Sequence, residues 1–155
     1  MAPDAAPDLG MVDALAQLSF LVQGTLSRHA AAQDLSIIQT RLLGILRDRE
    51  PTMQELARLL ELDKSSVTGL VDRAEKRGLV KRTPSTDDRR AIRVKLTALG
   101  RRTGLAIRNG FQVDVALATQ SLSEAEKKDL STLATRVIAA RAAERGYTTS
   151  TKNSS

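Results

Sequence analysis

One short stretch of this chain departs from the helical spacing of the rest. From Ile92 to Leu96 aliphatic and basic residues alternate one for one, which is the period of a half-buried strand. The apolar and basic segment at 79–82 predicts its antiparallel partner, with residues 85–90 as the turn. Ile92, Val94 and Leu96 are then expected to face the fold, with Arg93 and Lys95 facing outward. Because a lone two-stranded hairpin is unstable, it must pack on neighbouring helices.

Helical spacing governs most of the remaining sequence. Aromatic residues are only 2% of the chain, so its core must be aliphatic, which favours helices. We expect a mainly α protein with a small β-hairpin, in which Asp34 caps the second helix and Gly78 ends the fourth. Capping boxes are predicted at 52–55 and 123–126. The predicted helices cover residues 9–31, 35–48, 53–61, 64–77, 98–119 and 124–145, and the ends at 1–8 and 146–155 are predicted to be flexible.

The composition argues against several classes of protein. The chain has no cysteine, which excludes disulfides and thiolate metal sites, and it has a single histidine. No residues resemble a catalytic nucleophile with its base, a metal cluster or a glycine-rich phosphate loop, so we predict no catalytic residue, no metal and no cofactor. Without a signal segment or a long apolar run, the expectation is a cytoplasmic protein with no membrane partner.

The positive charge is concentrated in one central segment. Between Asp63 and Arg102 there are 12 lysines and arginines against 5 acids, whereas the chain as a whole has 24 and 18. Cations gathered on one face suit a polyanion such as DNA, because neutralising phosphates releases condensed counterions. A solvated basic surface without a partner is the alternative that charge alone leaves open.

The fourth predicted helix has the pattern of a DNA recognition helix. Val67, Leu70, Val71 and Ala74 form its buried stripe. The opposite face offers small hydroxyls and cations that suit phosphates and base edges, namely Lys64, Ser65, Ser66, Thr68, Arg73 and Lys76. An ordinary amphipathic helix with a polar outer face would have the same pattern. The cationic hairpin favours the DNA-binding interpretation, because an arginine at its tip can enter a minor groove.

The segment from Leu35 to Gly100 resembles the winged helix-turn-helix regulators of the MarR (multiple antibiotic resistance regulator) family. The resemblance is carried by TMQELARLLELDKSSVTGLVDRAEKRGLVKR and by DDRRAIRVKLTALG, which contains the family's wing signature, Asp-Arg-Arg at 88–90 and Leu-Thr-x-x-Gly at 96–100. It implies that the polar face of the fourth helix contacts the major groove. In the wing, it implies a minor-groove role for Arg90, an orienting role for Asp88, and phosphate contacts from Arg89 and Lys81, with Arg93 and Lys95 on the same cationic face.

The resemblance further implies a homodimeric repressor of a pseudo-palindromic operator, released by a small lipophilic or phenolic anion. Residues 9–31 and 101–145 would be dimerisation helices and residues 32–100 the DNA-binding domain. Apolar residues available for the dimer, unless they form an intramolecular core, are Ile107, Phe111, Val115, Leu130, Leu133 and Val137. Residues near one helix surface that could bind the effector are Phe20, Gln23, Ser27, Arg28 and His29. Alternatively, His29 only ends its helix and favours the helix dipole.

A winged helix can also serve protein–protein contact, since the fold alone does not dictate function. The run of cations on the wing argues against that alternative, for which an exposed apolar patch would be better suited. RNA binding finds little support, because the chain has one tyrosine and two phenylalanines for base stacking.

Overall fold

The computed structural model describes residues 7–86 and 90–144. Within these ranges the order of helices and strands is the predicted one, and a hairpin stands between the fourth and fifth helices. The elements are α1 (Gly10–Ala31), α2 (Ile37–Leu46), α3 (Met53–Leu60), α4 (Lys64–Lys76), β1 (Val80–Pro84), β2 (Ile92–Leu96), α5 (Ala98–Ala118) and α6 (Glu124–Glu144). The mainly α class with a β-hairpin is therefore confirmed.

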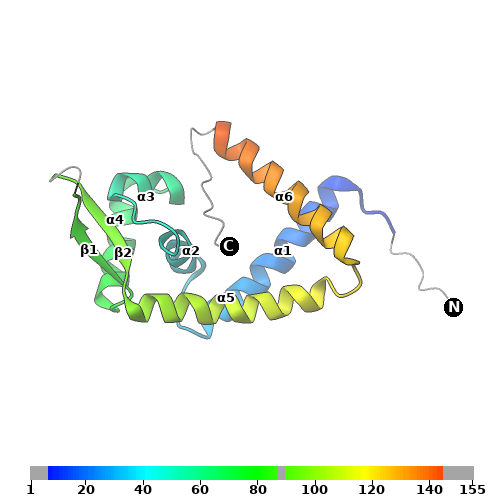
Figure 1. Ribbon diagram of the computed structural model, residues 1–155, viewed down its shortest axis with the longest axis horizontal. Helices are drawn as coiled ribbons and strands as arrows, with labels where there is room; N and C mark the ends of the chain where they lie inside the picture. Colours follow the sequence, from blue (N-terminus) through cyan, green and yellow to red (C-terminus); the bar gives the residue numbers. More distant parts are fainter. Residues whose placement is uncertain (1–6, 87–89, 145–155) are drawn as a thin grey trace.

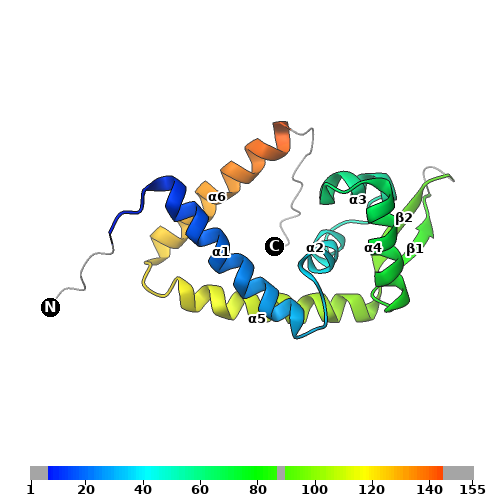
Figure 2. The ribbon, with the colours of Figure 1, turned by 180° about the vertical axis from the view of Figure 1, so that it is seen from behind.

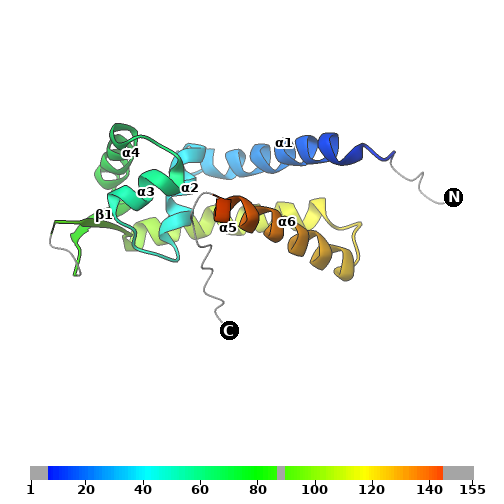
Figure 3. The ribbon, with the colours of Figure 1, turned by 90° about the horizontal axis from the view of Figure 1, so that it is seen from above.

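The molecule has two lobes, which Figure 1 shows at opposite ends of its long axis. We call residues 35–97 the winged lobe, and α1, α5 and α6 the helical lobe. The hairpin lies at the far end of the winged lobe, and α5 runs from its base into the helical lobe (Figure 1). Figure 2, from behind, shows α1 crossing α5 obliquely, and Figure 3, from above, shows both helices extending away from the hairpin; the two helices are in contact near the C-terminal end of α1. One long helix therefore joins the two lobes.

The start of α2 differs from the prediction. Asp34 does not cap the helix, because its backbone is left-handed, with φ of 54°, and its N–H donates to the Ala31 carbonyl. Ser36 is the N-cap instead, and Gln39 completes a capping box with it. The helix also ends at Leu46 rather than at Asp48. The Ser-x-x-Gln pattern at residues 36–39 favours Ser36 over Asp34, because the capping box satisfies two backbone N–H groups at the start of the helix.

The helix-turn-helix follows its local signals closely. The Thr52 hydroxyl accepts the Glu55 N–H at 3.2 Å, and Glu55 accepts the Thr52 N–H at 2.7 Å, so the predicted capping box is present. Asp63 caps α4, and Gly78 ends the segment as predicted, with φ of 69°. The predicted buried stripe of α4, from Val67 to Ala74, is fully buried. The caps set where α4 begins and ends, and its buried stripe sets which face of the helix points to solvent.

The hairpin is attached to the body on the side of β2. Val80 of β1 pairs with Leu96 and Pro84 with Ile92. The Val94 N–H donates to the Pro51 carbonyl at 2.9 Å, which ties the hairpin to the loop before α3. The prediction that Ile92 faces the fold is wrong, since its side chain is 47% exposed. Ile92 lies where the hairpin extends beyond the helices, so nothing beneath it completes a core.

The base of the hairpin is packed tightly against the start of α5. A Cβ on Gly100 would lie 1.9 Å from the Leu79 carbonyl oxygen, so a larger residue would push α5 away. The Thr97 hydroxyl caps α5 and donates to the Gly78 carbonyl at 2.6 Å. The Leu-Thr-x-x-Gly motif therefore fixes the wing to the helix that leads into the other lobe.

The helical lobe differs from the predicted dimer surface at Ile107, which is buried, and at Phe111, which is half-buried. Ile107 is only 2% exposed and belongs to the core cluster that α2 and α5 share, so it is not available to a partner chain. Val115, Leu130, Leu133 and Val137 are exposed, and no residue of α6 is buried. Among residues 7–86 and 90–144, no helix is long and apolar enough to span a bilayer.

Candidate nucleic-acid interface and effector cleft

The polar face of α4 is presented to solvent. Ser65, Arg73 and Lys76 are exposed, as are Lys64 and Ser66, whereas Thr68 is half-buried. The buried stripe fixes the rotation of the helix, so these side chains face away from the core. The structure thus brings the six predicted recognition residues together on one helix, most of them in its first two turns.

Asp63 organises the hydroxyls at the start of α4. It accepts hydrogen bonds from the Ser65 hydroxyl at 2.6 Å, the Ser66 hydroxyl at 2.7 Å and the Ser66 N–H at 2.8 Å. Hydrogen bonds from the hydroxyls of Ser65 and Ser66 lead the causes that hold the pKa of Asp63 well below its usual value. The Thr68 hydroxyl donates to the Lys64 carbonyl at 2.8 Å. These hydroxyl protons are engaged within the protein, and the oxygens retain lone pairs for incoming donors.

The described part of the wing places two of its cations against the body. Arg93 donates to the Ser85 hydroxyl at 3.1 Å and to the Glu50 carbonyl at 2.9 Å. Lys95 lies 3.9 Å from the Glu50 carboxylate. Both side chains are half-buried rather than fully outward, because the loop before α3 lies beside them. Lys81 and Arg90 are exposed, whereas Asp88 and Arg89 lie outside the described residues.

Arg82 joins the wing to α4. Its guanidinium forms ion pairs with Asp72 at 2.6 Å and with Glu75 at 2.5 Å, and its backbone N–H donates to Glu75 at 3.1 Å. Partial burial lowers the pKa of Arg82, but the hydrogen bonds to the two carboxylates outweigh it and raise that pKa. Arg82 is therefore a cation whose charge is held between β1 and α4.

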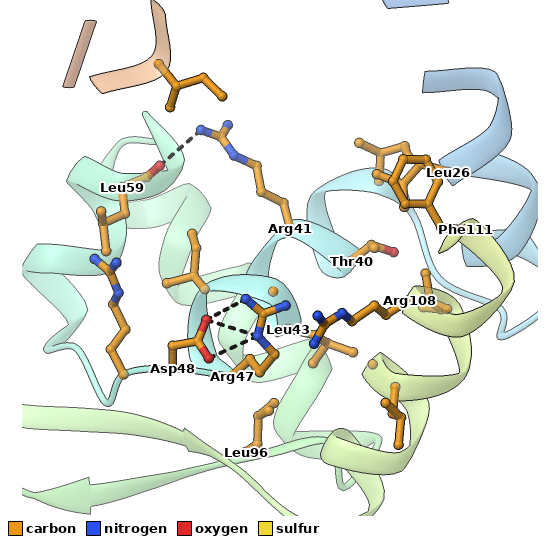
Figure 4. Close-up of a pocket in the computed structure, with 18 of the residues that line it drawn as sticks. Leu26, Thr40, Arg41, Leu43, Arg47, Asp48, Leu59, Leu96, Arg108 and Phe111 are labelled. Atoms are coloured by element: carbon orange, nitrogen blue, oxygen red, sulfur yellow. Dashed lines mark hydrogen bonds and ion pairs between the residues drawn. The ribbon is translucent and has the colours of Figure 1, made fainter. Parts of the chain in front are cut away.

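A large cleft lies between the two lobes. Its volume is about 1090 Å³, and its walls come from α1, α2, α5 and α6 and from the end of α3. Figure 4 shows Leu26, Leu43 and Phe111 among its apolar lining. The Thr40 hydroxyl oxygen in this wall is buried and has no hydrogen-bond partner among the described residues. The cleft is mostly apolar, with polar groups at a few places, as small-molecule sites commonly are.

Six arginines and two acids line the cleft. Arg41 is bound to the Leu59 carbonyl at 3.1 Å, and Arg47 is bound to Asp48 at 2.6 Å. The hydrogen bond from Arg47 is the largest cause that lowers the pKa of Asp48, and Arg108 also contributes. Arg108 has no hydrogen bond or ion pair within the described chain, and Figure 4 shows it extending from α5 toward Arg47.

The predicted effector residues lie mostly elsewhere. Of these five, only Gln23 lines the cleft. Arg28 and His29 instead bind Asp114 of α5, at 2.8 Å and 2.7 Å, and thereby join α1 to α5. A Cβ at Gly110 would lie 2.3 Å from the His29 ring, so the glycine makes room for this contact. Phe20 is 68% exposed, and Ser27 is not part of the lining. His29 lies in the last turn of α1, as the helix-end alternative requires, but its bond to Asp114 is a contact that neither interpretation included.

Sequence reasoning missed Thr40, Arg82 and Arg108. Thr40 and Arg108 belong to helices that pack face to face, and nothing in their local sequence shows which residues meet across the gap. Arg82 follows Lys81 directly, and two adjacent cations carry no signal of which one is paired. Only the alternation of side chains along β1 could have suggested that Lys81 and Arg82 point to opposite faces of the hairpin.

The family assignment follows from comparison with known proteins. The model of the MarR family matches residues 33–91. The chain is 34% identical over 107 residues to the HTH-type transcriptional repressor NicR of Pseudomonas putida, covering 63% of this chain and 68% of that protein. The chain belongs to the MarR family. It is also 30% identical over 96 residues to the uncharacterized HTH-type transcriptional regulator YfiV of Bacillus subtilis, covering 61% of this chain and 60% of that one.

Solved structures share the fold. Wild type MarR (apo form) from E. coli has a TM-score of 0.70 at 23% identity, over 84% of this chain and 98% of its own. NadR in complex with 4-hydroxyphenylacetate has a TM-score of 0.70 at 22% identity, over 87% and 96%. A MepR mutant of S. aureus bound to an oligodeoxyribonucleotide has a TM-score of 0.61 at 19% identity, over 86% and 99%. Regulators of this family are non-enzymatic DNA-binding proteins, so the predicted class, a transcriptional regulator and not an enzyme, is confirmed.

Proposed function

We propose that this protein is a homodimeric repressor that binds a pseudo-palindromic operator and is released by a small lipophilic anion. The observation that carries the proposal is the common placement of the α4 polar face and the cationic hairpin at one end of the molecule (Figure 1). Residues 32–100 form its DNA-binding domain, and residues 9–31 and 101–145 its dimerisation helices. The chain acts in the cytoplasm, with double-stranded DNA and a second copy of itself as partners.

The DNA contacts are assigned to two elements. The exposed side chains of α4 enter the major groove, where Ser65 and Ser66 present hydroxyl oxygens to base donors and Arg73 and Lys76 bind phosphates. Arg90 enters the adjacent minor groove, oriented by Asp88, while Lys81 and Arg89 bind the backbone. Arg93 and Lys95 add positive charge on β2, next to these proposed DNA contacts. Two copies then read half-sites about one helical turn, roughly 10 bp, apart.

Dimerisation is supported by apolar surface that one chain leaves uncovered. Leu130, Leu133 and Val137 recur at helical spacing on one face of α6, and all three are exposed. Val12 and Leu15 are exposed on α1 in the same lobe. Contiguous apolar area of this kind in a soluble protein marks an interface, and two copies of the lobe would cover each other's exposed stripes.

The release mechanism rests on the position of the cleft. Because it lies between the lobes, a bound ligand changes the spacing of the two α4 helices if it binds one spacing more tightly than the other. Arg47 is paired with Asp48, so Arg108, which extends toward it near the apolar wall, is the cation that would pair with an anion entering the cleft. The buried Thr40 hydroxyl offers a further hydrogen bond. The effector class that fits is an aromatic or otherwise apolar carboxylate or phenolate.

The DNA-binding proposal is tested by fluorescence anisotropy at two salt concentrations. The duplexes are taken from the DNA that lies upstream of the gene for this protein. Wild type should bind one duplex tightly with a steep salt dependence, and Arg90→Ala should bind about tenfold more weakly. Arg136→Ala, which removes an exposed arginine from α6, is the matched control and should bind like wild type. If wild type binds no duplex, DNA binding fails and the protein-contact alternative takes its place.

The effector proposal is tested with 4-hydroxyphenylacetate as the probe, in the same assay. The probe should release DNA from wild type but much less from Arg108→Gln. Arg102→Gln is the matched control, because Arg102 lies on α5 outside the cleft and is exposed. Equal release from both variants would remove Arg108 from the effector site. If apolar anions of several sizes release nothing, the cleft has no effector of this class.

A further inference from the structure

The two DNA-contacting elements of this chain are joined by one side chain. The Arg82 guanidinium reaches from β1 to two carboxylates of α4, with Nη2 2.6 Å from Asp72 and Nη1 2.5 Å from Glu75. Its backbone N–H adds a bond to the same Glu75 carboxylate at 3.1 Å. The Arg82 side chain is only 24% exposed, which is low for an arginine on a hairpin. A planar fork held at both ends allows little rotation of β1 relative to α4.

The other attachments of the hairpin are made by β2 and by the base of the hairpin. On the β2 side, Val94 bonds the Pro51 carbonyl and Arg93 bonds the Glu50 carbonyl, so β2 is tied to the loop before α3. At the base, Thr97 bonds the Gly78 carbonyl. Val94 is the cross-strand partner of Arg82, so these contacts hold β2 at the same level of the hairpin, but none of them reaches a side chain of α4. Arg82, two residues beyond the buried Val80, is the side chain that connects β1 to that helix.

The carboxylates that hold Arg82 lie beside the proposed DNA contacts. Asp72 is one turn after Thr68 and one turn before Lys76, so the three share a row on the outer face of α4. An uncompensated Asp72 in this row would repel phosphates, and Arg82 offsets its charge. Lysine could supply that charge, but its ammonium is a compact point charge on a flexible stem, whereas the planar guanidinium of Arg82 bonds two different carboxylates from two nitrogens held in fixed geometry.

We propose that Arg82 is a positioning residue that holds the wing and α4 at one angle, so that Arg90 and the α4 side chains reach their two grooves together. Arg82 itself does not contact DNA. Without the fork, the part of the hairpin beyond Arg82 and Val94 moves relative to α4, and Arg90 contributes little to binding even though it is unchanged. This inference rests on the proposed DNA-binding function.

The geometric part is tested without DNA. Because the chain has no cysteine, two spin labels can be placed cleanly at Lys76→Cys on α4 and Thr86→Cys on the hairpin. Pulsed electron resonance should give a narrow distribution of label distances in the otherwise unchanged protein and a broader one with Arg82→Met. Lys81→Met, the neighbouring exposed cation of the same strand, is the matched control and should leave the distribution narrow. Equal widths for all three proteins would overturn the proposal.

The functional part is a double-mutant cycle on the full-length protein with the operator duplex. Arg90→Ala should weaken binding about tenfold in wild type and about threefold or less in Arg82→Met, because the two residues act as a unit. In the Lys81→Met background the tenfold effect should persist. A tenfold effect in every background would mean that Arg82 does not position Arg90, and would overturn the proposal.

Two further results keep the interpretation unambiguous. If Arg82→Met lowers the unfolding temperature substantially, Asp72→Ala/Glu75→Ala replaces it, since this variant removes the acceptors and keeps the arginine. This double variant also removes two negative charges from α4, so it cannot increase the repulsion between α4 and the DNA phosphates. A smaller effect of Arg90→Ala in this background would therefore come from the lost bonds to Arg82. If Arg90→Ala has no effect even in wild type, the proposed wing contact fails, and the distance measurement still decides whether Arg82 fixes the angle.

Discussion

The two lobes of this protein bury their apolar residues to very different extents. Of the 16 buried hydrophobic residues in the described chain, 14 lie between Leu35 and Leu96. Of its 18 exposed large hydrophobic residues, 15 lie on α1, α5 and α6. Both regions have amphipathic helices in sequence, so hydropathy alone does not separate them. The winged lobe covers its apolar stripes within one chain, whereas the helical lobe leaves its stripes exposed.

The largest effect is expected in the core of the winged lobe. Leu56 is fully buried, so Leu56→Ala should lower the free energy of unfolding by about 3 kcal/mol through lost burial and a residual cavity. Urea unfolding followed by circular dichroism measures this loss. Leu133→Ala makes the same chemical change at a side chain that is 56% exposed and should cost far less in the isolated chain. Similar losses for the two variants would contradict the division into lobes.

The next effect concerns association of the helical lobes. Leu133→Asp places a charge on the exposed apolar face of α6 and should weaken dimerisation by roughly 30-fold, about 2 kcal/mol. Analytical ultracentrifugation over a concentration series measures it. Ser131→Asp adds the same charge on the opposite side of α6 and should leave the dimer intact. If both variants associate like wild type, α6 lies outside the interface.

A smaller effect compares the same capping motif in the two lobes. Thr52→Ala removes a cap from α3 and should cost about 1 kcal/mol of winged-lobe stability. Ser123→Ala removes the equivalent cap from α6, where Ser123 accepts the Glu126 N–H at 3.3 Å. Because no residue of α6 is buried in one chain, its loss should fray α6 and weaken dimerisation while the winged lobe unfolds as before. Hydrogen exchange resolved by segment distinguishes the two results.

The smallest effect is a pH dependence at the start of α4. Hydrogen bonds from Ser65 and Ser66 depress the pKa of Asp63 below its ordinary 3.8, so its contribution to stability is complete above that value. The contribution is lost as the pH falls through the lower pKa of the folded state. Asparagine also caps helices but does not titrate, so the stability difference between wild type and Asp63→Asn should shrink as the pH falls below 3.8. Urea midpoints from pH 6 downward measure it, and a pH-independent difference would contradict the assignment.

Much of the fold could be predicted because its signals are local. The Thr52 cap bonds a residue three positions away, and Gly78 adopts the left-handed conformation that its own lack of a Cβ permits. The Asp34 error arose where two cap residues lie two positions apart, and the choice between them depends on how α1 ends. The predicted inward position of Ile92 failed because alternation gives the face of a strand but not how far the body extends beneath it.

The sequence by itself determined the element order, most of the caps, the polar outer face of α4 and the family, because each depends on residues a few positions apart. Tertiary structure alone decided which cations are paired. Arg82 rather than Lys81 meets α4, Arg28 and His29 meet Asp114 about 86 residues away, and Arg108 faces the cleft. The physical reason is that a charge takes its partner from whatever the packed helices bring within a few ångströms, and that neighbourhood is set by the whole fold.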